Sequence, residues 1–342
     1  MTLFLRKVQD LVIIAITITS IIISLNSCQE SPISEETNDN LPDQGREITP
    51  AYVSLEERFQ TEIVNIGLEK LGYEINSMRE LEPALMHTDI ASGGIDYSAA
   101  HWEQIGQEFY DNSGGDETLE KVGVIIDNAV QGYLIDIATA EEYDITNLEQ
   151  LQDPEVAKLF DTNDNGKANL VGCNPGWGCE TIINHHLESY GLEDTVEHDQ
   201  GRYVALMADV VTRYEQNEPI LYYTWTPLWT SSVLVPGEDV KWLEVPYTSL
   251  PDSNSSEENI DTTYEGKNLG FVTDRIMIIA NKEFAQSNPD AVEFMEQVSI
   301  PIEDINDQNQ RLREGEDSSS EIRRHAETWI SNHEETFQQW LN

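Results

Sequence analysis

The chain has 342 residues, of which 39% are hydrophobic, so it can bury one large core or two ordinary ones. Its 19 Lys and Arg residues stand against 64 Asp and Glu residues, which gives a formal net charge of −45 and a pI near 4.1. Such a surface repels nucleic acid, which excludes that class of partner, and it keeps the chain soluble. A proteome adapted to salt would explain the acidity as well as a functional reason would.

The N-terminus predicts an exported protein. Arg6 and Lys7 precede an apolar run over residues 11–23, which is too short to span a bilayer comfortably. The following Leu-Asn-Ser-Cys, ending at Cys28, resembles the bacterial lipoprotein processing box, in which the cysteine is acylated. The alternative is a plain secretory signal with an incidental cysteine. We therefore expect a signal peptide over residues 1–27, lipid on Cys28, and no transmembrane protein.

Residues 28–48 are polar and acidic and predict a flexible tether between membrane and domain. Ordered structure should begin near Ser54. Ser54 and Glu57 form the pattern of a capping box, and a helical apolar stripe continues from there to Leu71.

The next elements predict a first domain crossing. Residues 83–91 favour a helix, and residues 95–102 favour a strand with Trp102 at its carboxyl end. Residues 122–126 and 130–137 are β-rich and lie close together, so we place the crossing there. In open α/β sheets ligands gather outside the carboxyl ends of strands, which makes Trp102 a candidate, although for one tryptophan alone core packing is the better explanation.

Residues 139–160 have helical character and lead into a loop over Asp161–Asn169 with the Asp-x-Asn-x-Asn-Gly spacing of a calcium site. The bidentate Glu expected at loop position twelve is absent, because Gly172 stands there. We therefore favour a plain Asn-Gly turn over calcium binding.

The most informative stretch follows a predicted strand over 169–172 and reads Cys-Asn-Pro-Gly-Trp-Gly-Cys-Glu over residues 173–180. The face of Trp177 favours a cation. A helix starting near Cys179 directs unpaired N–H groups at the loop and favours an anion. Gly178 lets a ligand approach the backbone closely. Together these features predict a binding site for a small zwitterion.

Three cysteines are present, and a lipidated Cys28 leaves Cys173 and Cys179 as one pair in an oxidising compartment. A disulfide closing so short a loop contributes only about 2.4 kcal/mol, so it would fix the shape of the loop rather than hold the fold. The alternative is a zinc site that adds His185 and His186. Adjacent histidines on a helix project about 100° apart, however, and chelate poorly together.

The remaining elements complete two α/β lobes. A strand over 219–225 ends in Trp225, and Thr226-Pro227 should open a helix. A strand over 275–280 returns to the first lobe. The alternation predicts lobe 1 over 49–135 and 272–342 and lobe 2 over 136–271, with a cleft between them. The other predicted pieces are a helix over 203–214, an acidic loop over 251–262, and helices over 289–299, 302–314 and 320–341.

Three runs now identify a resemblance: Gln131–Asp136, Cys173–Glu180 and Tyr222–Pro227 look like those of the periplasmic glycine betaine/proline betaine binding proteins of ABC importers. The similarity covers residues 52–340, including the 161–169 loop. It implies a type II periplasmic-binding fold whose α/β lobes close on the ligand. It also implies a betaine as ligand, an ABC permease with its ATPase as partners, and no cofactor.

Carried over by position, the resemblance implies an ammonium cage of Trp102, Trp177 and Trp225. It implies carboxylate contacts from the backbone N–H groups of Gly178 and Cys179, and a disulfide between Cys173 and Cys179. One position departs from the family pattern. The family has a histidine four residues after the first tryptophan, and here that position is Gly106. His101 would point to the other face of its strand.

The leading hypothesis is a lipid-anchored periplasmic receptor that delivers a betaine to a permease, with choline or another quaternary amine as an alternative ligand. An enzyme acting on such compounds is less favoured, since the sequence has no Gly-x-Ser-x-Gly, no phosphate loop and no free Cys/His pair. Asp209 and Glu180 are more simply helix-surface or capping groups. A domain fused to a permease is disfavoured because no spanning segment follows residue 28.

Overall fold

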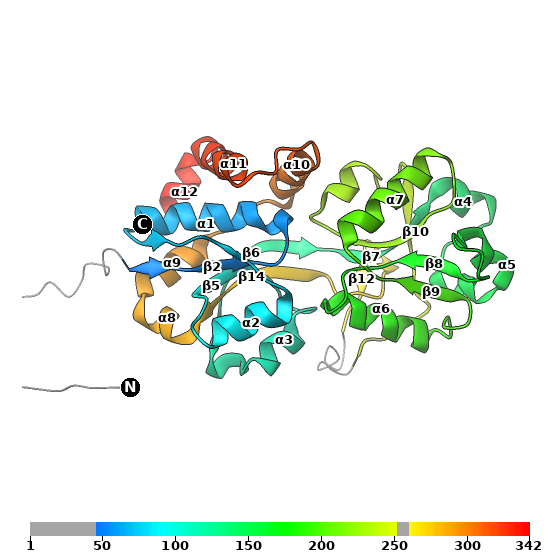
Figure 1. Ribbon diagram of the computed structural model, residues 1–342, viewed down its shortest axis with the longest axis horizontal. Coiled ribbons are helices and arrows are strands. Elements are labelled where there is room, and N and C mark those ends of the chain that lie inside the picture. Colours follow the sequence, from blue (N-terminus) through cyan, green and yellow to red (C-terminus); the bar gives the residue numbers. More distant parts are fainter. Residues whose placement is uncertain (1–45, 252–259) are drawn as a thin grey trace, which may run out of the picture. The chain divides into compact units, whose positions relative to one another are not determined.

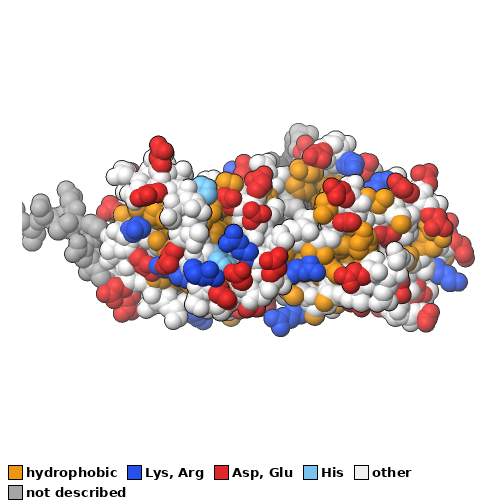
Figure 2. Space-filling model, turned by 90° about the horizontal axis from the view of Figure 1, so that it is seen from above, with side chains coloured by type: hydrophobic (Ala, Val, Ile, Leu, Met, Phe, Trp, Pro, Cys, Tyr) orange, Lys and Arg blue, Asp and Glu red, His pale blue; other side chains and the backbone are white. Residues whose placement is uncertain are grey.

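The computed structural model describes residues 46–251 and 260–342, which form two five-stranded sheets with helices on both faces of each (Figure 1). The predicted signal peptide, Cys28 and nearly all of the predicted tether lie outside the described residues. Within the described residues, no helix is long and apolar enough to cross a membrane. Acidic side chains are spread over the face shown in Figure 2, as expected of a solvated acidic surface.

The first sheet has the strand order β4-β2-β5-β14-β6. Strand β2 pairs in parallel with β4 and β5, whereas β14 runs antiparallel to both β5 and β6. Its strands are β2 (Pro50–Tyr52), β4 (Arg79–Glu80), β5 (Tyr97–Trp102), β6 (Leu119–Ala129) and β14 (Asp274–Asn281). Trp102 therefore ends β5, as predicted. A separate parallel pair joins β1 (Glu47–Ile48) to β3 (Glu74–Ile75).

The first two helices beside this sheet begin where the sequence predicts them. The capping box of Ser54 and Glu57 is formed and opens a 3₁₀ turn that continues into α1. Helix α2 has the predicted bounds, with Pro83 in its first turn. The helical segments of this lobe are η1 (Leu55–Glu57), α1 (Arg58–Lys70), α2 (Pro83–Ala91), α3 (Gln107–Asn112), η2 (Gly115–Glu117), α8 (Lys282–Ser287), α9 (Pro289–Gln297), α10 (Ile302–Arg313), α11 (Ser319–Asn332) and α12 (Glu334–Trp340).

The prediction of one helix over 320–341 is wrong, because His333 separates α11 from α12 with φ −117° and ψ 32°. The His333 ring stacks on Trp329 at 4.2 Å between centroids. The resulting turn brings Trp340 back to Trp329, at 5.9 Å between centroids. Burial of these rings in the core of the first lobe outweighs the continuous helical pattern.

The second sheet has the order β11-β7-β10-β8-β9. Strands β8, β9 and β10 are parallel, and β7 runs antiparallel to β10 and β11. Its strands are β7 (Gln131–Asp136), β8 (Ala168–Val171), β9 (Val196–Asp199), β10 (Leu221–Trp225) and β11 (Val240–Leu243), and a small hairpin joins β12 (Thr263–Tyr264) to β13 (Lys267–Asn268). Trp225 thus ends β10, again as predicted.

The prediction of one helical stretch over 139–160 is wrong. Asp136, Asn147 and Asp153 each accept a backbone N–H and start a new short segment, so the stretch is broken into pieces. Thr226-Pro227 is followed by a 3₁₀ turn rather than an α-helix. The helical segments of this lobe are α4 (Ile137–Glu142), η3 (Leu148–Gln152), α5 (Pro154–Ala157), η4 (Lys158–Phe160), α6 (Gly178–Ser189), α7 (Tyr203–Glu215) and η5 (Trp229–Ser232).

The boundary between the lobes also needs a correction. Residues 131–135, which we expected in lobe 1, pair with β10 and β11 of the second sheet. The chain therefore passes between the sheets at Val130, between β6 and β7. The sequence pattern could not locate this crossing, because the segments on both sides of Val130 are rich in β-forming residues. The return falls before Asp274, where β14 enters the first sheet.

Candidate functional site

One pocket brings together all five residues predicted to hold a ligand. Trp102, Trp177, Trp225, Gly178 and Cys179 line it together, with walls from both lobes. The first lobe contributes the end of β5, the η1 turn, α2 and α10. The second lobe contributes the end of β10 and the start of α6. The predicted cage and the predicted anion contacts therefore share a single cavity.

The indole of Trp102 is hydrogen-bonded to a residue at the start of the first helix. Its indole Nε1–H donates to Glu57 Oε1 at 3.1 Å. The other oxygen of Glu57 accepts the backbone N–H groups of Val53 and Ser54, at 3.0 and 3.1 Å. Burial raises the pKa of Glu57 to about 7. The capping residue of the helix is thus also the residue that orients the indole of Trp102, a predicted cage residue.

The other two tryptophans belong to the second lobe and touch each other. Trp225 and Trp177 meet edge to face with 5.9 Å between ring centroids. Trp225 also packs on Tyr203 at 4.5 Å. The indole N–H of Trp177 donates to Glu82 of the first lobe at 2.8 Å. Trp225 is therefore packed among aromatic rings, and Trp177 is hydrogen-bonded to the first lobe.

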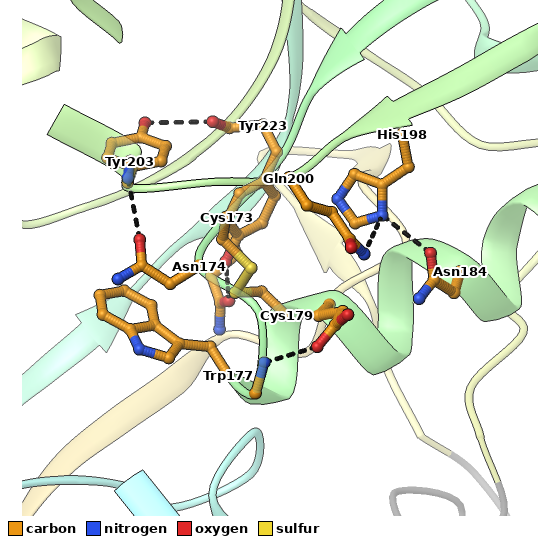
Figure 3. The surroundings of a disulfide bond; sticks show 12 residues. Cys173, Asn174, Trp177, Cys179, Asn184, His198, Gln200, Tyr203 and Tyr223 are labelled. Carbon is orange, nitrogen blue, oxygen red and sulfur yellow. Dashed lines mark hydrogen bonds between the residues drawn. A yellow bond between two sulfur atoms is a disulfide. The ribbon is translucent and has the colours of Figure 1, made fainter. Parts of the chain in front are cut away.

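The loop before α6 is shaped by a disulfide between Cys173 and Cys179, with 6.5 Å between their Cα atoms (Figure 3). This confirms the predicted disulfide. The side chain of Asn174 accepts the N–H of Tyr203 at 2.8 Å, which ties the loop to the start of α7. Gly176 has φ +85°, a conformation that L side chains rarely adopt.

The start of α6 faces the pocket. Trp177 occupies the N-cap position and Gly178 and Cys179 are the first two helical residues, so their N–H groups lack intrahelical partners. The positive end of the helix dipole adds to these donors. The arrangement suits a carboxylate beside the indole rings.

The alternative zinc site is wrong, because the two sulfurs are bonded to each other. His185 contacts Ser249 instead, and His186 lies between Tyr133 and Ser249. The described ranges 46–251 and 260–342 hold no cluster of three or more metal-ligating side chains.

In the loop over Asp161–Asn169, the Asp161 carboxylate accepts three backbone N–H groups of its own loop, the shortest from Gly166 at 2.7 Å. These contacts close the loop into a turn, and the choice between a plain turn and a calcium site stays a prediction.

Gly178 allows a close approach between the lobes. A Cβ atom at this position would lie 2.3 Å from the carbonyl oxygen of Ile105, in the turn after Trp102. We expected the ligand to use this space, whereas here the backbone of the other lobe does. Asp274 holds that turn by accepting the N–H groups of Gln104 and Ile105 at 2.9 and 3.1 Å. Burial raises the pKa of Asp274 to about 6.

Comparison with known proteins decides the family. Residues 46–332 match the substrate binding domain of ABC-type glycine betaine transport systems (OpuAC). The chain belongs to this family. It is 46% identical over 306 residues to the glycine betaine-binding periplasmic protein OusX of Dickeya dadantii (strain 3937), covering 89% of this chain and 91% of the relative. It is 45% identical over 305 residues to the glycine betaine/proline betaine-binding periplasmic protein of Escherichia coli (strain K12), with the same coverage of both chains.

A solved structure shares the fold. The glycine/betaine/L-proline-binding protein (ProX) of an ABC transporter from Borrelia burgdorferi aligns with a TM-score of 0.66 at 18% identity, covering 87% of this chain and 97% of that chain. These findings confirm the predicted family and the two-lobed periplasmic-binding fold. Since the family consists of substrate-binding domains, they also confirm that the chain is a binding protein rather than an enzyme.

Residue 106, where the resemblance implied a histidine, has no room for a side chain. Gly106 caps α3, and a Cβ there would lie 2.5 Å from the carbonyl oxygen of Trp102 and 3.2 Å from Nδ1 of His101. His101 is fully buried and lies outside the pocket lining, as its position on the strand predicted. The missing imidazole is therefore not supplied by either residue.

An imidazole does reach the pocket from α2, and the sequence did not reveal it. His87 lines the pocket with Nδ1 2.7 Å from the carbonyl of Pro83 and Nε2 3.0 Å from Nδ1 of His101. A carbonyl only accepts, so Nδ1 of His87 carries its proton and Nε2 accepts from His101. Burial lowers the pKa of His87 to about 4, which keeps the ring neutral. A lone histidine on the buried face of a helix gives no signal beyond ordinary core packing.

Asn309 of α10 is a second residue that sequence reasoning missed. Its side chain is fully buried and lines the pocket, and its Nδ2 and Oδ1 have no hydrogen-bond partner among the described residues. A buried amide without partners costs free energy. Asn309 is therefore placed to bind a ligand or a water in the pocket.

The space around Gly106 leads to a prediction about stability. Gly106→Ala should lower the free energy of unfolding by roughly 1–3 kcal/mol, because its Cβ must displace the backbone at Trp102. Urea denaturation measures this. The control is Gly201→Ala, where the nearest atom to a Cβ is 3.6 Å away. A Gly106→His variant as stable as the wild type would contradict the steric argument.

Proposed function

We propose that the protein is an exported receptor that captures glycine betaine or proline betaine and delivers it to an ABC permease. The observation that supports this most strongly is the single pocket lined by Trp102, Trp177 and Trp225 together with the start of α6. A quaternary ammonium has no hydrogen to donate and a diffuse charge, so indole faces suit it better than carboxylates alone. The N–H groups of Gly178 and Cys179 then take the ligand carboxylate.

The gross interaction energies of such a site can be compared with the affinity of a micromolar ligand. Three desolvated cation–π contacts give on the order of 6 kcal/mol gross. Two charge-assisted N–H bonds add about 3–6 kcal/mol. Ordering and association remove at least ~4 kcal/mol. The balance is at most about 5–8 kcal/mol, so it meets the roughly 8 kcal/mol of a micromolar ligand only at its upper end.

The test is a titration of the intrinsic tryptophan fluorescence with glycine betaine, proline betaine, choline and proline. We expect saturable binding of at least one betaine and weaker binding of proline, which has no quaternary methyl groups to fill the cage. Choline is the second candidate ligand, because no side-chain donor for a carboxylate stands at Gly106. Choline binding as tight as that of glycine betaine would move the proposal to a receptor for quaternary amines in general. The absence of binding by all four compounds would refute it.

Membrane anchoring is a separate part of the proposal. We expect the mature chain to begin at an acylated Cys28 and to remain attached to a membrane on the periplasmic side. Metabolic labelling with a radioactive fatty acid should mark the wild type, and Cys28→Ala should abolish the label. Equal labelling of both proteins would exclude lipidation at this residue.

The disulfide should matter for binding more than for stability. Thiol counting on the unreduced exported protein should find no reactive Cys173 or Cys179. In a Cys173→Ala/Cys179→Ala variant the loss of unfolding free energy should be about 2.4 kcal/mol, because the closed loop is short. Betaine affinity should fall more steeply, since the loop no longer fixes Trp177 and the first turn of α6. A variant with wild-type affinity would show that the crosslink plays no part in the site.

A further inference from the structure

Glu57 is a carboxylate on the wall of a pocket that suits a cation. Both of its oxygens are occupied by donors from different directions. Oε1 accepts the indole N–H of Trp102, and Oε2 accepts the backbone N–H groups of Val53 and Ser54. The helix needs only the second set of contacts, since a capping box is complete with one side-chain oxygen. The bond to Trp102 is therefore additional to the needs of the helix.

Only a carboxylate can make both sets of contacts. A glutamine offers one acceptor oxygen and one NH₂ donor group. If its oxygen kept the backbone amides, its NH₂ would face the indole N–H, and two donors would oppose each other. Glutamate at this position thus fixes the plane of the Trp102 ring in a way that its neutral isostere cannot.

Glu57 also places charge on the part of the lining that the first lobe supplies. The donors for an anion belong to the second lobe, on the first turn of α6. A negative charge beside Trp102 attracts a cation at full strength. It attracts a zwitterion less, because the ligand carboxylate offsets part of the interaction.

We propose that Glu57 is a positioning and specificity-determining residue of this pocket, which holds the Trp102 indole and raises the affinity for cationic quaternary amines relative to zwitterionic betaines. This inference rests on the proposed function, since it needs a quaternary ammonium in the cage.

The charge of Glu57 can be changed by pH while the ionisable groups around it keep their protonation states. Glu56 precedes it on the same turn and opposes its ionisation. From α2, His87 is neutral above its pKa of about 4. From β10, Tyr223 has a pKa raised well above its ordinary value by burial. Asn309 of α10 also lines the pocket, and its amide does not titrate.

The experiment compares choline and glycine betaine by titration at pH 6 and pH 8 on the wild type, Glu57→Gln and Trp102→Phe. Ionisation of Glu57 across its pKa of about 7 should make wild-type choline affinity higher at pH 8 than at pH 6. At pH 8, Glu57→Gln should weaken choline about tenfold and glycine betaine about threefold, and should remove the pH dependence. Trp102→Phe also removes the hydrogen bond between Trp102 and Glu57, but it leaves the Glu57 carboxylate in place. This variant should therefore keep the pH dependence of choline binding.

The chain offers a matched control in Glu321, a second capping-box glutamate, which accepts from Ser318 at the start of α11 and does not line the pocket. Glu321→Gln should leave both affinities and their pH dependence unchanged.

Equal loss of both ligands in Glu57→Gln, or no loss of either, would overturn the inference while leaving a betaine receptor in place. If Glu57→Gln does not fold, loss of the pH dependence in Trp102→Phe would overturn it. A wild type that binds neither compound would refute the proposed function itself.

Discussion

Replacing any one of Trp102, Trp177 and Trp225 with alanine should weaken betaine binding by roughly 1–3 kcal/mol, or about 5- to 150-fold. Each ring lines the pocket, and each offers a π face that alanine lacks. Phenylalanine should be milder than alanine at all three positions, because a weaker face remains. Isothermal titration calorimetry on the three pairs of variants measures the difference.

The control for the cage must be a tryptophan of similar exposure outside the pocket. Trp242 on β11 is partly buried and packs over Gly132, away from the pocket lining. Trp242→Ala should leave betaine affinity within about twofold of the wild type, since this ring does not line the pocket. If it weakens binding as much as the three cage changes do, the assignment of the cage is wrong. Trp340 is a poorer control, because it is buried in the core of the first lobe.

Gly178→Ala is expected to separate binding from stability. Its Cβ would lie 2.3 Å from the Ile105 carbonyl, so the two walls of the pocket could not approach as they do here. Overpacking of this kind typically costs 1–3 kcal/mol, which predicts a 5- to 150-fold loss of betaine affinity. The contact joins the two lobes, and alanine is a better helix former than glycine in the first turn of α6. The free energy of unfolding should therefore change little.

The measurement pairs a betaine titration with urea denaturation on the same variant. Gly201→Ala is the matched control, because its Cβ would meet only ordinary van der Waals contacts. A Gly178→Ala variant that binds betaine as tightly as the wild type would show that the approach of Ile105 to α6 is not part of the ligand-bound arrangement.

Part of the site was determined by local sequence. Trp102 and Trp225 stand at strand ends, and Trp177 stands at a helix start, so their positions follow from which residues form strands and helices. The capping box of Ser54 and Glu57 spans three residues and could be recognised for the same reason. The Cys173–Cys179 disulfide closes a short loop, so the pairing needed no knowledge of the fold.

Other features were decided only by tertiary packing. Glu57 meets Trp102 across 45 residues, and Trp177 meets Glu82 across 95. No local period encodes such pairs, because they depend on how sheet and helix are stacked. His87 and Asn309 reach the pocket for the same reason, although each looks like an ordinary polar residue on a helix.

The sequence by itself determined the family, and it placed the aromatic rings and the helix start that line the pocket, because these depend on residue types and short spacings. The tertiary structure decided where the chain crosses between the sheets and why position 106 is glycine. It also decided which carboxylates hold the indoles. These depend on the free energy of packing distant segments together, which overrides local patterns, as the breaks in the predicted helices over 139–160 and 320–341 also show.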